Sequence, residues 1–135
     1  MIFKTTYTDK KVSLEMNHLL GKKYSFFQKV KRKGVGSSRF IVQNVSVGLL
    51  EFIHPKPYIS YVNIEIRPKG IIVFFNKKYQ TWAWCIPFYH LTIFKSKHSS
   101  IHAQGHSLTI GSLNNSPLHF LKKILEAKAK YEKEN

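Results

Sequence analysis

Acidic residues, cysteine and long apolar runs are all scarce in this chain of 135 residues. The single cysteine, Cys85, excludes an intrachain disulfide framework, so the fold must rest on its core, and a reducing compartment is favoured. The longest uncharged apolar run, Trp82 to Phe94, is far shorter than the roughly 20 residues that span a membrane, and residues 1–9 lack the organisation of a signal peptide. We therefore expect a cytoplasmic protein, soluble or at most peripheral to a membrane.

The signatures of catalysis are also missing. The chain contains no Gly-x-x-x-x-Gly-Lys-Ser/Thr phosphate loop, which leaves nucleotide hydrolysis without support. The glutamates that could serve acid–base chemistry form no recognisable pair: Glu51, Glu65, Glu126, Glu132 and Glu134. Cys85 would need a histidine such as His90 beside it to act as a nucleophile, and its apolar neighbours favour a buried structural thiol. We expect neither enzyme activity nor a cofactor.

Three histidines recur every four residues, at His98, His102 and His106. On a helix this spacing would form a metal-binding face. The surrounding residues predict a β-hairpin instead, in which His102 points away from Ile101 and Ala103 and His106 lies in the turn. Side chains in these positions need not converge, so we expect no metal site.

Positive charge is what the chain has in excess. Its 22 lysines and arginines against seven acidic residues give a formal net charge of +15. Ten of the basic residues, but two of the acidic ones, lie in residues 1–40. A field of this size attracts polyanions and anionic membrane surfaces, although the same charge also supports solubility.

The densest basic segment predicts an anion site. Its members flank the glycine-rich turn at residues 34–38 and are Lys29, Lys31, Arg32, Lys33 and Arg39. Such a turn can present backbone N–H groups to a phosphate beside the side-chain charges. The nearby Tyr24, Phe26 and Phe27 could insert at a membrane interface or stack on unpaired bases. The alternative, a solvated extension whose aromatic residues pack on the core, stays open.

Residues 1–38 are interpreted as a basic N-terminal extension, partly helical, in front of a β domain that spans residues 39–135. The apolar residues from Val12 to Leu20 have the spacing of one or two helical turns. Residues 22–33 are ambiguous, because their aromatic and apolar side chains suit either a helix face or an alternating strand. If they form a strand, the strand count rises by one and the basic run lies in the first loop.

Seven strands and one helix are expected from residue 39 onward. The strands span 40–53, 60–67, 71–76, 80–87, 91–96, 99–104 and 107–111, and the helix spans 116–132. The second strand is the clearest, because Val62, Ile64 and Ile66 alternate with polar residues. Gly48 indicates a bulge or bend within the first strand. Short turns between successive strands predict antiparallel pairing, with the helix covering an open end or face.

The last hairpin and the helix carry local signals of their own. If Gly105-His106 is a type II′ turn, the apolar pairs Ala103–Leu108 and Ile101–Ile110 face each other. Ser116 followed by Pro117 is typical of a helix start. The apolar face of the helix consists of Phe120, Leu121, Ile124 and Leu125.

Two neighbouring strands are apolar on both faces. In the fourth strand Trp82, Trp84 and Ile86 share one face, while the smaller Ala83 and Cys85 share the other. The third strand has apolar neighbours at residues 71–72 and 74–75, which cannot all point to one side. The second face must be covered by the helix, the N-terminal segment or another subunit, so homo-oligomerisation is a hypothesis.

Two short motifs resemble features of the bacterial pleckstrin-homology-like domain family. Ile66-Arg67-Pro68-Lys69-Gly70-Ile71 resembles its strand, Arg-Pro-type turn and second strand, and Trp84-Cys85-Ile86-Pro87-Phe88 resembles its strand ending in Ile-Pro and an aromatic residue. Over roughly residues 39–133 the resemblance implies a seven-stranded antiparallel barrel or sandwich capped by one amphipathic helix. The loop at residues 54–58, which gathers basic residues in phosphoinositide-binding relatives, holds a single lysine, so that ligand is not carried over.

Three functions remain open on these grounds. The first is a non-catalytic binding module that engages an anionic phospholipid surface or a protein partner through residues 29–39. The second is a nucleic-acid-binding protein that uses the basic segment at residues 22–39. The third is a structural or homo-oligomeric assembly protein whose charge serves solubility alone.

Overall fold

The computed structural model describes residues 1–7, 9–31, 34–37, 39–53, 60–77, 80–95, 98–111 and 118–134. Within them the chain forms eight strands, three α-helices and two short 3-10 helices. In chain order these elements are β1 (Ile2–Lys4), α1 (Lys10–Leu20), α2 (Phe26–Lys31), β2 (Phe40–Val45), η1 (Val47–Leu49), β3 (Tyr61–Arg67), β4 (Gly70–Lys77), β5 (Gln80–Pro87), η2 (Phe88–His90), β6 (Thr92–Lys95), β7 (Ser99–Ala103), β8 (His106–Gly111) and α3 (Leu118–Glu134).

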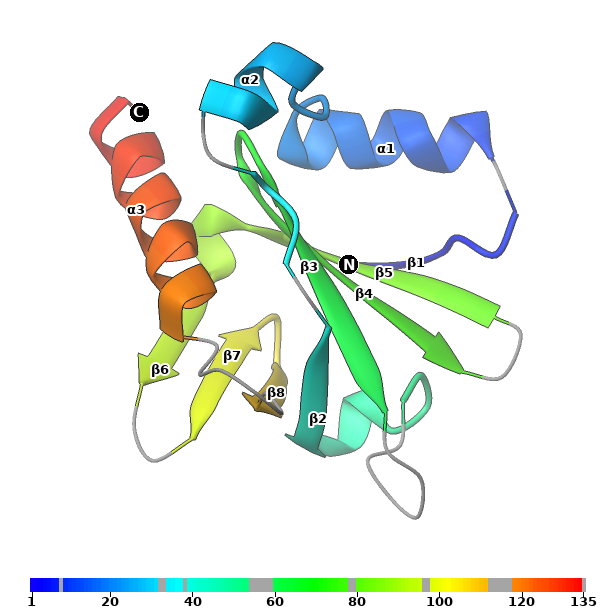
Figure 1. Cartoon of the computed structure of the whole chain (residues 1–135). Helices are drawn as coiled ribbons and strands as arrows, with labels where there is room; N and C mark the ends of the chain where they lie inside the picture. The colour runs from blue at the N-terminus through cyan, green and yellow to red at the C-terminus, as the bar shows by residue number, and fades with distance from the viewer. Residues whose placement is uncertain are drawn as a thin grey trace.

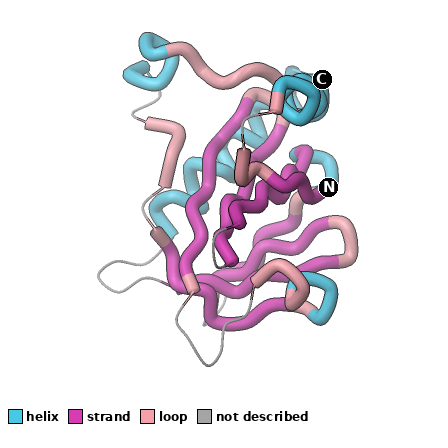
Figure 2. The backbone as a smooth tube through the Cα atoms, turned by 90° about the vertical axis from the view of Figure 1, so that its right-hand side faces the viewer, coloured by secondary structure: helices cyan, strands magenta, loops and turns pink. Residues whose placement is uncertain are grey.

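All of these strands belong to one antiparallel sheet with the order β1-β5-β4-β3-β2-β8-β7-β6. Two meanders, β2 to β5 and β6 to β8, meet where β2 pairs with β8, and they lie at an angle to each other (Figures 1 and 2). Among the described residues no pairing joins the edge strands β1 and β6, so the sheet is open. The expected mainly β fold with a C-terminal helix is confirmed, whereas the expected count of seven strands and the barrel closure are wrong.

The additional strand is β1, which extends the sheet beyond β5. Ile2 lies opposite Trp84, and Lys4 lies opposite Trp82. Three residues are too few to show an alternating pattern, so β1 depends on the free edge of β5 rather than on a signal of its own. The segment 1–38 therefore contributes a strand to the main sheet, while its division from the rest of the chain at residue 38 stays a prediction.

The strand expected at residues 40–53 is shorter in the structure. β2 ends at Val45, and the chain turns through η1 instead of continuing. At Gly48 a Cβ atom would lie 2.6 Å from Cε1 of His106, so the turn can approach the histidine ring closely because residue 48 has no side chain. The expected bend at Gly48 is thus the turn that ends the strand.

Two hairpins lie at places where the sequence predicts turns. β3 and β4 pair with Ile66 opposite Ile71 around the turn Pro68-Lys69, between the two expected strands. β7 and β8 pair with Ile101 opposite Leu108, so the expected turn at residues 105–106 is wrong by one position. The turn is Gln104-Gly105, with φ of 55° and 81°, and positive φ at both positions is what a type I′ hairpin requires. The partner of Ile101 shifts by two residues, so the same side chains still face the core.

Each face of the sheet is covered by a different helix. Trp84 and Ile86 belong to the main core, which includes Phe120, Leu121 and Ile124 of α3. Ala83 and Cys85 point the other way and pack with Ile72 and two residues of α1, Met16 and Leu20. The N-terminal segment is therefore what covers the second apolar face of β4 and β5, and the apolar pattern that suggested another subunit is accounted for within one chain.

Local signals mark both ends of α1, and a tertiary contact accompanies the end of α3. Asp9 caps α1, because its Oδ1 accepts a hydrogen bond of 2.9 Å from the Lys11 N–H, and Gly21 ends it with a φ of 83°. α3 is confirmed with an end at Glu134, close to the expected residue 132, and Phe88 packs against its Tyr131 with ring centroids 5.6 Å apart. Ser116 and Pro117, the expected start of α3, lie outside the described residues.

Candidate functional site

The ambiguous segment at residues 22–33 contains the helix α2, which carries two of the expected anion-binding residues. Ser25 and Gln28 form a reciprocal cap at its start, since Ser25 N–H donates to Gln28 Oε1 at 2.9 Å and Gln28 N–H donates to Ser25 Oγ at 3.3 Å. Lys29 is half-buried and Lys31 is exposed. Arg32 and Lys33 lie outside the described residues.

The glycine-rich turn that follows is bound to β3. Ser37 N–H donates to the Ile64 carbonyl and Ile66 N–H donates to the Val35 carbonyl, both at 2.8 Å. The Gly34 N–H donates to the Lys29 carbonyl at 2.8 Å. The N–H groups of Gly34 and Ser37 are therefore already used within the protein.

Arg39 lies apart from the two lysines of α2. Its guanidinium stacks over the ring of Tyr61, with 4.7 Å between Cζ and the ring centroid. Val35 lies beside Ile66, whereas Arg39 lies beside Tyr61. Ile66 and Tyr61 are five residues apart on β3, which separates their Cα atoms by roughly 16 Å. Figure 1 shows the chain running along β3 between α2 and β2. The structure thus brings Lys29 and Lys31 together on α2 and places Arg39 elsewhere.

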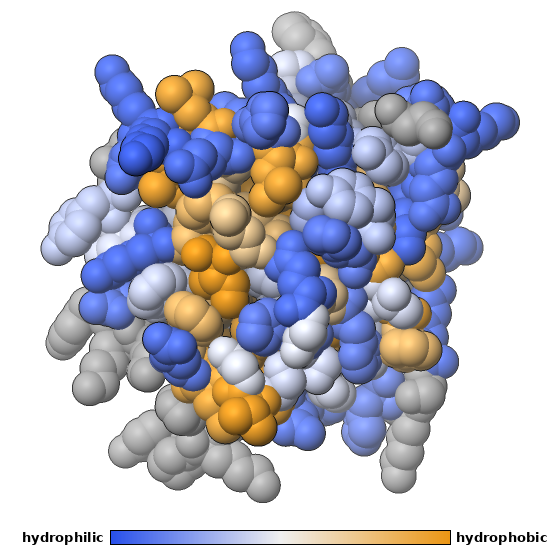
Figure 3. Space-filling view, turned by 180° about the vertical axis from the view of Figure 1, so that it is seen from behind, coloured by the Kyte–Doolittle hydropathy of each residue, from blue (hydrophilic) through white to orange (hydrophobic). Residues whose placement is uncertain are grey.

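Other lysines join α2 at the same end of the molecule. Gly21 lies against Pro68, and the Lys69 N–H donates to the Leu20 carbonyl at 2.9 Å, so the β3–β4 turn touches the end of α1. We call the lysines around this contact the basic end; they are Lys22, Lys23, Lys29, Lys31 and Lys69, of which all but Lys29 are exposed. Figure 3 shows hydrophilic side chains across much of another face, so it is not exposed charge alone that distinguishes the basic end.

A shortage of acidic residues is what distinguishes it. Between Glu15 and Glu51 the sequence contains no aspartate or glutamate. The same interval contains Lys22, Lys23, Lys29, Lys31, Arg32, Lys33 and Arg39. Glu65, on the adjoining strand, is bound to Arg67, with 2.7 Å between Glu65 Oε2 and Arg67 Nε. None of the five lysines of the basic end forms an ion pair with the residues that the structure describes.

Arg67 is buried beneath this end, with 2 % of its surface exposed. In addition to Glu65, its Nη1 donates to Asn17 Oδ1 at 3.1 Å and to the Gly21 carbonyl at 2.8 Å. These bonds connect β3 to α1 and hold the guanidinium in one position. Glu65 itself is partly buried, with 18 % of its side chain exposed.

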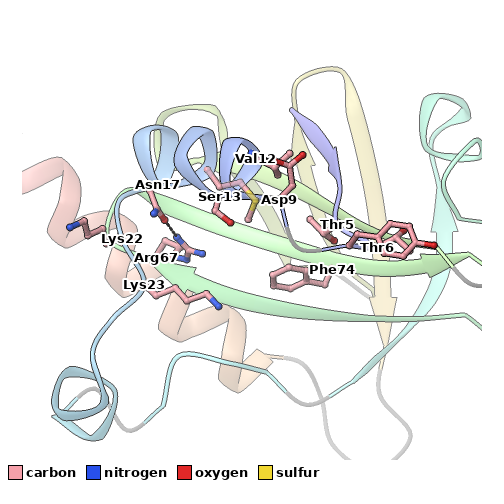
Figure 4. Close-up of a pocket in the computed structure, with 12 residues that line it drawn as sticks. Thr5, Thr6, Asp9, Val12, Ser13, Asn17, Lys22, Lys23, Arg67 and Phe74 are labelled. Carbon is pink, nitrogen blue, oxygen red and sulfur yellow. Dashed lines mark hydrogen bonds between the residues drawn. The ribbon is translucent and has the colours of Figure 1, made fainter.

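A groove of about 540 Å³, which we call the α1 groove, opens next to Arg67 (Figure 4). Its lining comes from the segment after β1, from α1, from the residues that follow it, and from β3 and β4: Thr5, Thr6, Tyr7, Asp9, Val12, Ser13, Met16, Asn17, Lys22, Lys23, Arg67 and Phe74. Figure 4 shows Arg67, Lys22 and Lys23 at one end, Phe74 in the middle and Thr5 and Thr6 at the other end. Sequence reasoning missed this groove.

A smaller groove of about 330 Å³ separates α3 from the turn after α2. Lys123, Glu126 and Lys130 line it on the helix side, and Gly34 and Val35 line it on the other. Lys123 Nζ donates to the Gly34 carbonyl at 3.2 Å. Because an acidic residue stands between two lysines here, this groove is a weaker place for an anion than the basic end.

Cys85 and the histidines are arranged as structural residues. Cys85 is completely buried, and this burial raises the pKa of its thiol to about 12, which disfavours the nucleophilic thiolate. His102 faces Ser100, with 2.9 Å between its Nε2 and the serine Oγ, whereas His106 packs edge-on against the core residue Trp84. In the part of the chain that the structure describes, no three histidine, cysteine or acidic residues are grouped so that they could hold a metal ion.

Comparison with known proteins found no match to a family model, to a curated protein or to a solved structure. The described helices include none with the length and apolar character needed to cross a membrane. The arrangement of charge, burial and cavities in this chain is therefore what supports a functional proposal.

Proposed function

We propose that this protein is a non-catalytic binding module of pleckstrin-homology-like type that engages an anionic phospholipid surface through its basic end. Seven antiparallel strands followed by a C-terminal helix are what the family resemblance implies, and β2 to β8 followed by α3 have that order. The open sheet and the added strand β1 are departures from that family pattern.

The observation that carries the proposal is a group of five lysines, four of them exposed, that form no ion pair among the described residues. A lysine close to an anionic membrane contributes about 1 kcal/mol to binding. The five lysines of the basic end together supply about 5 kcal/mol, which corresponds to a dissociation constant on the order of 0.2 mM. Binding of this strength is reversible and sensitive to salt, which is the behaviour of a peripheral module.

Vesicle cosedimentation tests the proposal. The wild type should bind vesicles of phosphatidylcholine with 30 mol% phosphatidylglycerol and should not bind phosphatidylcholine alone. Lys29→Ser combined with Lys31→Ser removes one half-buried and one exposed charge and should weaken binding roughly 30-fold, at about 1 kcal/mol for each lysine. The matched control, Lys95→Ser with Lys122→Ser, removes the same charge from β6 and the start of α3 and should change binding less than threefold.

A parallel titration with single-stranded DNA tests the nucleic-acid alternative. If an oligonucleotide binds more tightly than the anionic vesicles, and its affinity falls log-linearly with salt, the protein is a nucleic-acid-binding protein and the lipid proposal is wrong. An equal loss of vesicle binding in the control variant would also contradict the proposal, because it would assign the effect to net charge alone.

A further inference from the structure

We propose that the α1 groove binds an elongated amphipathic organic anion, with its acid group at the Arg67 end and its apolar part over Phe74. This inference goes beyond the binding of a membrane surface, because the site can accept a molecule free in solution. The volume of about 540 Å³ lies within the range of small-molecule sites, which extends from roughly 300 to 1,000 Å³.

The acid group is placed by the charges at one end of the groove. Nε and Nη1 of Arg67 are bound to Glu65, Asn17 and Gly21, whereas its Nη2 has no hydrogen-bond partner among the described residues. Nη2 can therefore donate to a phosphate or carboxylate oxygen from a guanidinium that is already held in place. Since Glu65 neutralises Arg67, the net positive charge at this end comes from the exposed Lys22 and Lys23.

The middle of the groove is apolar. Phe74 lies on the face of β4 opposite to the main core, and α1 covers it only in part. Val12 and Met16 of α1 line the groove with it. An alkyl or aromatic segment laid across these side chains would remove apolar surface from water, and this favours a ligand with an apolar body over a simple ion.

Hydroxyl groups and a carboxylate mark the far end. Thr5 Oγ1 is buried without a hydrogen-bond partner among the described residues. Thr6 Oγ1 accepts a hydrogen bond of 3.0 Å from the Thr81 N–H, and its own O–H is left to donate. Asp9 lies in the same lining and repels an anion. This polarity directs the acid group toward Arg67 and leaves a polar site for the other end of the ligand.

Isothermal titration with hexyl phosphate tests the site, with inorganic phosphate and hexanol as probes of each half alone. Hexyl phosphate should bind at least tenfold more tightly than either, since only it reaches both the charged end and Phe74. Ser13→Leu places a larger side chain in the groove at an exposed helix position and should weaken hexyl phosphate binding at least tenfold. Glu15→Leu, on the same helix but outside the lining, is the matched control and should bind like the wild type.

Charge variants separate the groove from the α2 part of the basic end, because Lys22 and Lys23 belong to both sites whereas Lys29 and Lys31 lie outside the groove lining. Lys22→Ser with Lys23→Ser should weaken hexyl phosphate binding, whereas Lys29→Ser with Lys31→Ser should leave it unchanged. Equal affinity for hexyl phosphate and inorganic phosphate, or full binding by Ser13→Leu, would overturn the groove proposal. If Lys29→Ser with Lys31→Ser loses vesicle binding but keeps hexyl phosphate binding, both proposals are supported. If this variant keeps vesicle binding but loses hexyl phosphate binding, both are contradicted.

The source of the anion is settled by competition. If hexyl phosphate displaces the protein from vesicles that contain phosphatidic acid, the groove takes the headgroup of a membrane lipid. If the protein binds both at once, the ligand is a free organic phosphate. Both results require a ligand in the groove. If the groove binds neither hexyl phosphate nor the phosphatidic acid headgroup, the assignment is overturned.

Discussion

The sheet carries a helix on each face, and the two helices are held in different ways. α3 packs through large apolar side chains, Phe120, Leu121 and Ile124, which join the main core. α1 contributes two buried residues, Met16 and Leu20, to a smaller cluster and is tied to β3 by the buried Arg67. The α3 side stabilises the fold by apolar burial, whereas the α1 side combines a modest apolar contact with charge and a groove. In our proposal, binding is served by the side with fewer apolar contacts.

Truncation of one leucine in each helix should give the largest effect. Leu121 and Leu20 are both completely buried. Leu121→Ala should lower the free energy of unfolding by about 4 kcal/mol, because the main core surrounds it, and Leu20→Ala by about 2.5 kcal/mol, because α1 can shift toward the sheet beside an open groove. Urea denaturation of both variants measures this difference. A larger loss for Leu20→Ala would contradict the contrast between the two faces.

Arg67→Met should lower the free energy of unfolding by about 3 kcal/mol, since it leaves Glu65 partly buried without its partner and removes two bonds to α1. The double variant Arg67→Met with Glu65→Met should recover at least half of this loss, because no unpaired charge remains. Denaturation of the single and double variants measures both effects. If the single variant costs less than about 0.5 kcal/mol, Arg67 does not hold α1 on the sheet.

The last effect concerns Cys85 and appears only at high pH. Burial raises the pKa of its thiol to about 12 from an ordinary value of 9.0. The unfolded chain then loses the thiol proton first, so the folded state loses stability as the pH rises from 9 toward 12, by at most about 1.4 kcal/mol per pH unit. Cys85→Ala should show a shallower decline of stability than the wild type above pH 9. Identical declines in the two proteins would show that the thiol does not titrate differently on folding.

Regular alternation made the central strands predictable. Val62, Ile64 and Ile66 in β3, and the opposed faces of β5 around Trp84 and Cys85, follow from a period of two that any half-buried or fully buried strand must satisfy. The terminal helix followed from its apolar face in the same way. The last hairpin was placed one residue too late because Gln104, which is not a glycine, adopts a positive φ.

The binding features were harder to predict, for physical reasons. α2 had a local signal in Ser25-x-x-Gln28, a capping pattern that would have resolved the helix from the strand. The α1 groove had none, because Arg67 meets Asn17 and Gly21 across 50 and 46 residues of chain, and such contacts exist only after folding. The basic segment was recognised from its charge, but its sequence did not reveal that Arg39 would lie away from α2.

The most direct test of the central claim is vesicle binding by two variants measured side by side. Lys29→Ser with Lys31→Ser changes the basic end, and Ser13→Leu changes the groove alone. On vesicles with 30 mol% phosphatidylglycerol we predict a roughly 30-fold loss for the lysine variant and less than a twofold change for Ser13→Leu. Wild-type binding by the lysine variant would contradict the assignment of the basic end as the surface that meets an anionic membrane.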